Sequence, residues 1–240
     1  MIKLEKREFI YFLTMDAEEN RWNTTFVREI SDALDEVEND EGPGALITSS
    51  ANPKFFSNGL DLDWIQSTES HPNGGDREVF GEEFMYLMGR MITLPIPTVC
   101  AINGHAFGAG FMFALSHDVR IMREDRGFLC ANEMQLGLPI PRPELALFKH
   151  KVPANAFFET VQLSRRWTGS EALNAGIIQG VSSLDELPEV AQSKAEELAP
   201  LANNRKNFGH QKEMLYGENA AINLSHGPAH MLKNSKDFND

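Results

Sequence analysis

The 240-residue sequence predicts an α/β fold built around one main domain. Strand-like and helix-like patterns alternate through the first third of the chain, which is typical of α/β units. Apolar strands run into glycine-containing turns that lead directly to helices. The later part of the chain is mainly helical, and the 42% hydrophobic composition suffices for one large core.

The first elements follow from the spacing of apolar residues. Residues 8–15 place Phe9, Tyr11, Leu13 and Met15 in alternation and predict a strand. The same reasoning gives helices at 24–37 and 78–94, a strand at 44–49, a Gly-rich surface loop at 67–76, a strand at 97–103, a helix of about eight residues ending at 117, and a strand at 118–123.

The rest of the chain predicts helices at 154–163, 170–174, 187–199 and 207–217, with a short strand at 176–181. Residues 223–240 are polar and poorly patterned, so we expect a frayed tail or an arm that docks on a neighbouring subunit.

Composition argues against several classes of function. The formal net charge of -13 is unfavourable for binding nucleic acid or an anionic membrane surface, so a small soluble ligand is expected. No apolar run approaches the roughly 18 residues of a membrane span.

Cys100 and Cys130 lie in apolar runs, which favours reduced thiols in the cytoplasm or an organelle matrix. The terminal Phe238-Asn239-Asp240 is not a signal of the Ser-Lys-Leu kind, so peroxisomal import by that signal is not expected.

Two glycine-containing turns, 55–61 and 103–110, each join an apolar strand to a helix-like segment. Glycine lets a backbone approach a ligand closely, and two converging N–H groups stabilise a carbonyl oxygen that gains negative charge. Either turn alone could equally be an ordinary connection between a strand and a helix.

Residues 97–110, Pro-Thr-Val-Cys-Ala-Ile-Asn-Gly-His-Ala-Phe-Gly-Ala-Gly, followed by Ala-Leu-Ser-His-Asp at 114–118, resemble the signature of the crotonase (enoyl-CoA hydratase/isomerase) superfamily. Residues 55–62 resemble its first oxyanion-hole turn, and residues 132–137 resemble its catalytic-carboxylate segment. The resemblance implies a crotonase-like spiral of ββα turns at 1–181, carrying an acyl-CoA site. It also implies C-terminal helices at 182–240 that complete the subunit or cover a neighbour in a homotrimer or hexamer.

The resemblance also implies roles for individual residues. The backbone N–H groups of Leu60 and Ala109 would form the oxyanion hole, and the backbone of Phe56 and Ser57 would help to hold the CoA adenine. No separate cofactor is expected, because CoA is part of the substrate. The remaining candidates for contact with the substrate are Asp61, which is more often structural in the family, Gly108, Phe111 and Met112.

The carboxylates distinguish the possible reactions. Hydratases of the family use two glutamates to activate water, but Met112 occupies the place of the first, and only the second is present, as Glu133. The segment Asn132–Gly137 is similar to that of Δ3,Δ2-enoyl-CoA isomerases. One carboxylate can take a proton from C2 and return one at C4, so we expect isomerisation of a 3-enoyl-CoA to the trans-2-enoyl-CoA. The alternatives are hydration, thioester hydrolysis, or acyl-CoA binding without catalysis.

Several other residues are weaker candidates. Glu144 is an alternative base, since a second isomerase subgroup carries its base near this point. An apolar wall of Phe107, Phe111, Met112 and Phe113 would exclude water and raise the pKa of Glu133, although these side chains could equally lie in the core.

His105 and His117 lack further ligands at metal-binding spacing, so no metal is expected there. Lys54, Lys212 and Lys233 are candidates for pairing with the CoA phosphates, or are surface lysines.

Overall fold

The computed structural model describes residues 1–67, 74–218 and 226–238. Its larger sheet has the order β1-β2-β3-β5-β7-β9, in which β1 and β2 are antiparallel and the other pairs are parallel. The bounds are β1 Ile2–Arg7, β2 Ile10–Met15, β3 Ala45–Ser50, β5 Thr98–Ile102, β7 Val119–Arg123 and β9 Gly180–Ser182.

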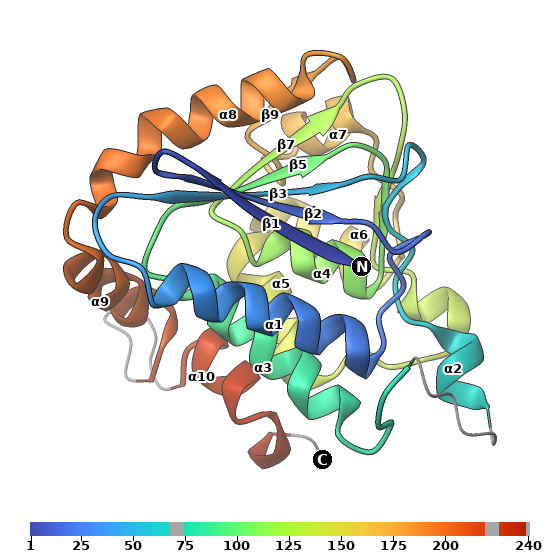
Figure 1. The fold of residues 1–240 in the computed structure, drawn as a ribbon. Helices are drawn as coiled ribbons and strands as arrows, with labels where there is room; N and C mark the ends of the chain where they lie inside the picture. Colours follow the sequence, from blue (N-terminus) through green and yellow to red (C-terminus); the bar gives the residue numbers. More distant parts are fainter. Residues whose placement is uncertain (68–73, 219–225, 239–240) are drawn as a thin grey trace.

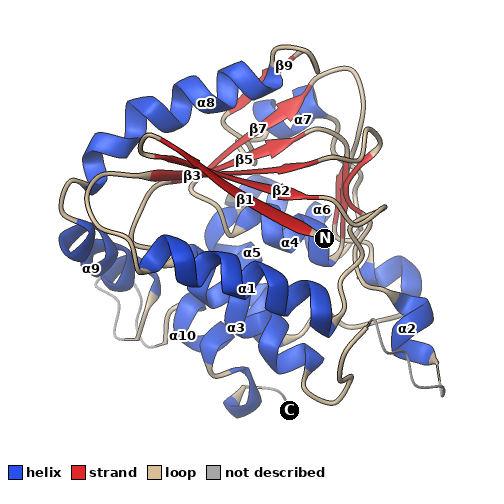
Figure 2. Cartoon of the chain, viewed as in Figure 1, coloured by secondary structure: helices blue, strands red, loops and turns tan. Residues whose placement is uncertain are grey.

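A second, smaller sheet has the order β4-β6-β8 and consists of Phe55–Ser57, His105–Phe107 and Leu129–Cys130. Each of these short strands follows one strand of the large sheet along the chain: β4 follows β3, β6 follows β5, and β8 follows β7. A helix comes next in each case, so three successive ββα turns stack on one another, and Figure 2 shows both sheets in this arrangement. The predicted α/β architecture of ββα turns is confirmed.

The first of the two main helical layers covers the face of the large sheet below it in Figure 1 and includes α1 (Thr24–Glu38), α3 (Phe80–Ile92) and α4 (Ala109–Leu115). Helix α1 begins at Asn23, whose side chain accepts a hydrogen bond from the Phe26 N–H. Trp22 lies at the centre of this layer, with its ring edge-on to Phe26, Phe84 and Phe113 at 5.0 Å between centroids. The main core therefore lies between the sheet and these helices.

Helix α8 (Leu187–Leu198) crosses the opposite face of the large sheet (Figure 1). Ala191, Ala195 and Ala199 follow at intervals of four residues and are fully buried against apolar side chains of the sheet strands. Small side chains at this spacing let the helix lie close to the strands. Helix α8 thus packs on the sheet of its own chain.

The last described segment differs from expectation. Residues 228–233 form helix α10, Pro228–Lys233, with Ala229 and Leu232 fully buried in the main core. Helix α10 packs against α3 and α5 (Arg142–Lys151), next to α9 (Arg205–Tyr216) and before the short turn η3 (Ser235–Asp237). The expected frayed tail was wrong for this part, while residues 219–225 and 239–240 lie outside the described residues.

Two other elements were given no bounds by the sequence patterns. Residues 2–7 form β1, which pairs with β2 in a hairpin around Glu8. Residues 142–151 form α5. Pro141 and Pro143 stand at its start, where proline is compatible with a helix. The remaining helical segments are α2 Leu62–Gln66, η1 Glu133–Leu136, α6 Ala154–Val161, α7 Gly169–Asn174 and η2 Ala199–Ala202.

Part of the predicted loop at 67–76 falls on residues 68–73, which are not described. No helix among the described residues combines the length and hydrophobicity needed to cross a membrane.

Candidate active site

Three chain segments that leave the strands of the small sheet meet at one cavity of about 70 Å³. The turn after β4 contributes Asn58, Gly59 and Leu60, the turn after β6 contributes Gly108 and Ala109, and the segment after β8 contributes Asn132 and Glu133. Ligand sites in parallel α/β structures commonly lie at the carboxyl ends of strands, where such turns converge. Leu62, Leu136 and Leu138 complete the lining.

The first two turns pack directly against each other through glycine. Gly59 has a φ of 81°, and a Cβ added to it would lie only 2.9 Å from the Phe107 carbonyl oxygen. Gly108 has a φ of 48° and directly precedes α4. A side chain at either position would separate the turns or strain the backbone, so glycine here sets how closely they approach.

This contact brings Leu60 and Ala109 to the same cavity. The Ala109 N–H is at the first residue of α4, where no intrahelical acceptor exists. Among the hydrogen bonds of the described residues outside regular helices and strands, neither N–H donates to an acceptor. Both groups are therefore able to donate to an oxygen of a ligand in the cavity.

A buried network of hydrogen bonds around Ser57 supports the first turn. The Ser57 hydroxyl donates to the Asn20 carbonyl oxygen at 2.7 Å and accepts from the Trp22 indole N–H at 3.0 Å. The Asn20 side chain donates to the Phe56 carbonyl oxygen at 3.0 Å. Phe56 and Ser57 are fully buried, so their side chains position the turn, and a role in holding adenine rests on their backbone alone.

Asp61 has a structural function in the described contacts. Its carboxylate caps α2 by accepting a hydrogen bond from the Trp64 N–H at 3.2 Å, and it also accepts from the Asn23 side chain at 3.4 Å. The two bonds link the starts of α1 and α2 next to the Leu60 N–H. Asp61 does not line the cavity.

Glu133 begins the short helix η1, and its carboxylate lies beside the second turn. A Cβ added to Gly108 would be 3.2 Å from Glu133 Oε1, which places this oxygen next to the residue that precedes Ala109. Glu133 Oε2 is buried and has no hydrogen-bond partner in the described part of the chain. Burial raises the pKa of Glu133 above its usual value, because few groups solvate the negative charge.

Glu144 approaches Glu133 from α5. Burial raises the pKa of Glu144 to about 8, and the negative charge of Glu133 adds to this increase. Glu144 does not line the cavity, which Glu133 does. The two groups therefore differ: Glu144 is mainly protonated at neutral pH and does not line the cavity, whereas Glu133 lines it.

The proposed apolar wall lies mostly in the core. Phe111 packs edge-on against Phe148 at 5.5 Å, Phe113 packs against Trp22 and Phe56, and Met112 is 1% exposed among the same core residues. None of them lines the cavity. Contact of Phe111 and Met112 with a substrate remains a prediction, and the apolar lining in this structure comes from leucines.

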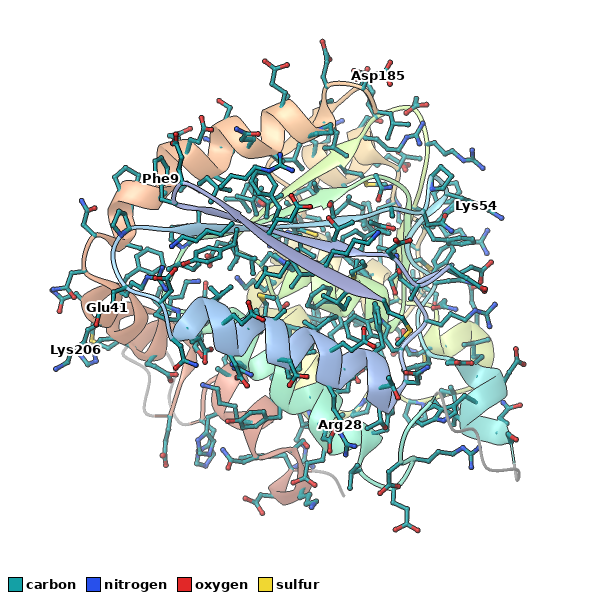
Figure 3. The ribbon with its side chains drawn as sticks, viewed as in Figure 1. Phe9, Arg28, Glu41, Lys54, Asp185 and Lys206 are labelled. Carbon is teal, nitrogen blue, oxygen red and sulfur yellow. The ribbon has the colours of Figure 1, made fainter. Side chains whose placement is uncertain are left out.

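The three lysines differ in their availability for phosphate. Lys212 is buried, and its ammonium contacts Asp118 Oδ2 at 2.7 Å and the Ile96 carbonyl oxygen at 3.1 Å. The Lys233 ammonium donates to Thr93 and Glu213. Lys54 projects from the surface before β4, and its ammonium lies 4.7 Å from the Phe55 ring (Figure 3). Lys212 and Lys233 are thus engaged within the chain, and Lys54 alone of the three is exposed.

The two histidines near the second turn have structural contacts. His117 is buried, and its nitrogens contact the Phe113 carbonyl oxygen at 2.9 Å and the Thr48 hydroxyl at 2.8 Å. Burial lowers the pKa of His117 to about 4, so the ring is neutral. His105 stacks on Phe107 at 5.2 Å between centroids, on the small sheet.

Sequence reasoning missed some residues of the cavity. Asn58 and Asn132 line it, as do Leu136 and Leu138 on the far side of η1. Asn132 could have been predicted from the sequence, because it directly precedes Glu133 and belongs to the same segment. The leucines, which are 51% and 43% exposed, had no distinguishing pattern.

Comparison with known proteins adds independent information. A family model described as enoyl-CoA hydratase/isomerase matches residues 5–231. The chain is 33% identical over 222 residues to enoyl-CoA delta isomerase 3 of Arabidopsis thaliana, covering 91% of this chain and 93% of that protein. It is 35% identical over 185 residues to enoyl-CoA delta isomerase 2, peroxisomal, of the same plant, covering 76% and 77%.

Among solved structures, human mitochondrial delta3-delta2-enoyl-CoA isomerase superposes with a TM-score of 0.81 at 24% identity, covering 98% of this chain and 87% of that one. At this identity the likeness concerns the fold, including two sheets and C-terminal helices.

Proposed function

The chain belongs to the enoyl-CoA hydratase/isomerase family, whose members act on acyl-CoA thioesters, and we propose that it is a Δ3,Δ2-enoyl-CoA isomerase. The reaction moves the double bond of a 3-enoyl-CoA to the trans-2 position. The observation that carries this proposal is the position of Glu133: one carboxylate with a raised pKa faces the cavity beside two available backbone N–H groups.

The proposed chemistry follows from that arrangement. The thioester carbonyl oxygen accepts hydrogen bonds from the Leu60 and Ala109 N–H groups, which stabilise the negative charge that forms on it. The Glu133 carboxylate removes a proton from C2, and the electron pair of that C–H bond becomes part of an enolate. The protonated Glu133 then gives a proton to C4, so the double bond shifts and the carboxylate is regenerated.

The surroundings of α4 favour isomerisation over hydration. Met112 stands where hydratases of the family carry their first glutamate, and it is buried in an apolar core. A thioether is only a weak hydrogen-bond acceptor and cannot remove a proton from water. The relatives named enoyl-CoA delta isomerase support the same reading.

The size of the cavity limits what part of the substrate it holds. A volume of about 70 Å³ accommodates the thioester carbonyl and the adjacent carbons, and not a whole acyl-CoA. The exposed side chains of Leu136 and Leu138 offer apolar surface for an acyl chain at the mouth. We assign the CoA end to the side of β4, where Lys54 is exposed and the Phe56–Ser57 backbone lies.

Hydration is the second candidate, because of Glu144. This carboxyl group is close enough to Glu133 for the charge of Glu133 to raise its pKa. The pair could position a water between them, as two carboxylates from different segments. The pKa near 8 weighs against this reading, since Glu144 is then a poor base at neutral pH.

We further propose that the chain assembles as a homotrimer or a hexamer in a reducing compartment. Phe158 and Leu163 of the α6 region are 62% and 59% exposed, and Met134 lies nearby at 36%. Large exposed apolar side chains in and just after α6 support an interface between copies. Both cysteines are free and buried, as is usual for proteins kept reduced.

The reaction is tested by the identity of the product. Purified protein is incubated with 3-enoyl-CoA thioesters of several chain lengths, and the products are separated by chromatography with mass detection. Isomerisation gives trans-2-enoyl-CoA of unchanged mass, whereas accumulation of 3-hydroxyacyl-CoA favours hydration and free CoA favours thioester hydrolysis. Binding without turnover at every chain length would remove the enzymatic proposal.

A further inference from the structure

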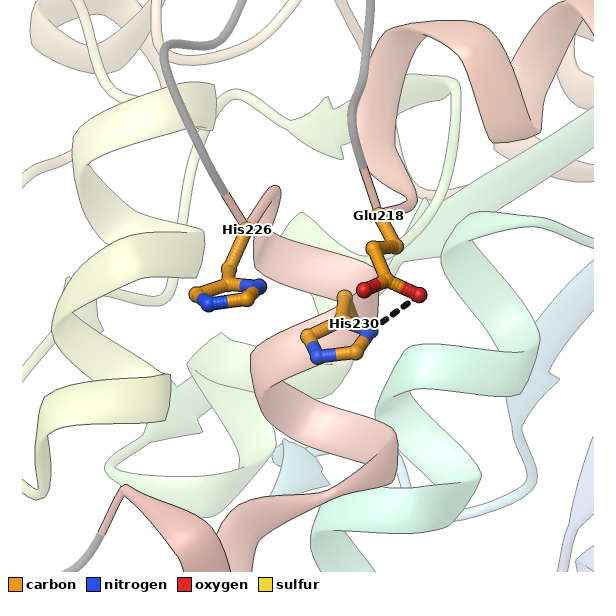
Figure 4. Close-up of side chains that lie close together, drawn as sticks. All are labelled: Glu218, His226 and His230. Atoms are coloured by element: carbon orange, nitrogen blue, oxygen red, sulfur yellow. Dashed lines mark ion pairs between the residues drawn. The ribbon is translucent and has the colours of Figure 1, made fainter.

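Glu218, His226 and His230 gather where the chain returns from α9 to α10 (Figure 4). Each offers one atom able to bind a metal, and these atoms lie within 4.8 Å of one another. Glu218 Oε2 lies 3.8 Å from His230 Nδ1, which is longer than a hydrogen bond. None of the three lines the active-site cavity.

The backbone holds two of these residues side by side, although seven positions separate them in sequence. The Gly227 N–H donates to the Gly217 carbonyl oxygen at 3.0 Å, which places Glu218 and His226 directly beyond this bond. A Cβ added to Gly227 would lie 2.3 Å from the Tyr216 carbonyl oxygen, so only glycine permits this approach.

The third residue is fixed by α10. His230 follows His226 by four residues, and the two rings stack at 4.7 Å between centroids. Phe238 packs edge-on against both rings, at 5.3 and 5.8 Å. The Asn234 side-chain amide lies 3.5 Å from His230 Nδ1 and donates to the His230 carbonyl oxygen at 2.9 Å. The imidazoles are therefore already gathered before any ligand arrives.

We propose that Glu218, His226 and His230 form a binding site for a divalent transition-metal ion, with Zn²⁺ the best match. Two imidazoles and one carboxylate are a donor set that suits Zn²⁺, and water completes a tetrahedral shell. Bonds of about 2.0–2.2 Å require the ligand atoms to close by roughly 1 Å. Rotation of the surface side chains supplies this movement, because Glu218 and His226 are exposed.

A metal here would join the end of α9 to α10. Helix α10 packs against α3 and α5, and its Lys233 donates to Thr93 and Glu213. The ion therefore holds α10 in place on the core and stabilises the C-terminal part of the chain. This role is independent of the reaction at Glu133.

The test measures Zn²⁺ binding to chelator-treated protein by calorimetry, with Co²⁺ absorbance as a second readout of coordination. Wild type is expected to bind one ion, and His226→Ala, His230→Ala and Glu218→Gln each to weaken binding at least about tenfold. The matched control is His210→Ala, which removes an exposed histidine of α9 outside the cluster. It is expected to bind like wild type.

Thermal unfolding supplies the check on folding. Without metal, all variants are expected to unfold near the wild-type temperature, and Zn²⁺ should raise that temperature in wild type and His210→Ala only. Lack of binding by wild type at about 100 µM Zn²⁺ would overturn the proposal. Undiminished binding by the cluster variants would do the same, since the ion would then be adventitious.

Discussion

At the scale of single residues, Glu133 and Glu144 are the same chemical group in different surroundings. Glu133 has one buried oxygen without a partner among the described residues and lines the cavity, whereas Glu144 belongs to α5 and does not line it. Both pKa values are raised, chiefly by burial, and that of Glu144 reaches about 8. A base for a weakly acidic C–H bond benefits from a raised pKa only if it still ionises near the working pH, and the pKa of about 8 counts against Glu144 in this respect.

The raised pKa of Glu144 predicts a pH-dependent stability. The folded chain keeps this proton up to about pH 8, while an unfolded chain releases it near 4.5, so ionisation favours unfolding as pH rises between these values. Glu144→Gln should therefore gain stability relative to wild type as pH rises, by on the order of 4 kcal/mol between about pH 5 and about pH 9. Urea unfolding at both pH values measures the gain, and a constant difference would contradict it.

Sequence reasoning reached the central residues because their neighbours form a recognisable motif. Leu60, Ala109 and Glu133 all line the cavity, as their positions in the glycine turns and in the segment 132–137 suggested. The sequence could not show that Lys212 is engaged within the chain, because its ion pair with Asp118 joins residues 94 positions apart. Such long-range pairing leaves no local signal in a sequence.

At the scale of elements, the start of α4 combines several constraints. Gly108 has a positive φ, donates its N–H to the Cys130 carbonyl oxygen at 2.9 Å, and leaves room for the Glu133 carboxylate. A methyl group here would press on Glu133 Oε1 and displace the Ala109 N–H. The turn thus links the proposed oxyanion hole to the proposed base.

Gly108→Ala is expected to reduce turnover by at least about tenfold, because a shift of a fraction of an ångström at either group disturbs the reacting geometry. The control is Gly42→Ala, which has a φ of 80° with open space around the added Cβ. Both variants should lose roughly 1 kcal/mol of stability from backbone strain, but only the first should lose turnover. Equal turnover in the two variants would contradict this reading.

The burial of Met112 in α4 makes a glutamate at this position unfavourable. Met112→Glu buries a charge in the apolar core and is expected to destabilise the fold by roughly 3 kcal/mol or more, without producing hydration. Met112→Leu, which keeps the volume, should cost less than about 1.5 kcal/mol. Denaturant unfolding and product analysis together check this pair, and a stable, hydrating Met112→Glu would refute the account of α4.

Periodicity predicted long amphipathic elements well and failed on others for identifiable reasons. Helix α1 was expected at 24–37 and spans Thr24–Glu38, because its buried residues recur every three or four positions. Helix α5 was missed because prolines suggested a loop, and α10 because only two apolar residues, Ala229 and Leu232, mark its buried face.

At the scale of the whole molecule, stacking of three ββα turns brings separate segments to one site. The large sheet supplies a rigid base, α8 covers one face and the main core covers the other (Figure 1). The spiral arrangement was predicted from the family resemblance and not from the strands themselves. Local patterns do not encode which strands become neighbours.

The exposed apolar face beside α6 predicts how the chain assembles. Phe158→Asp and Leu163→Asp should each shift the protein from a trimer or hexamer toward monomer, because a buried charge opposes association. Leu201→Asp, at a residue that is 63% exposed on η2, is the matched control and should leave the mass unchanged. Sedimentation velocity gives the masses, and a wild-type mass in both α6-region variants would exclude this face.

The most direct measurement of the central claim compares Glu133→Gln with Glu144→Gln on the same 3-enoyl-CoA. If Glu133 transfers the proton, Glu133→Gln should reduce the rate of 2-enoyl-CoA formation by at least about 10³-fold while binding the CoA ester with nearly unchanged affinity. Glu144→Gln should stay within about tenfold of wild type. Retained isomerisation in Glu133→Gln, with loss in Glu144→Gln, would contradict the account and transfer the role of base to Glu144.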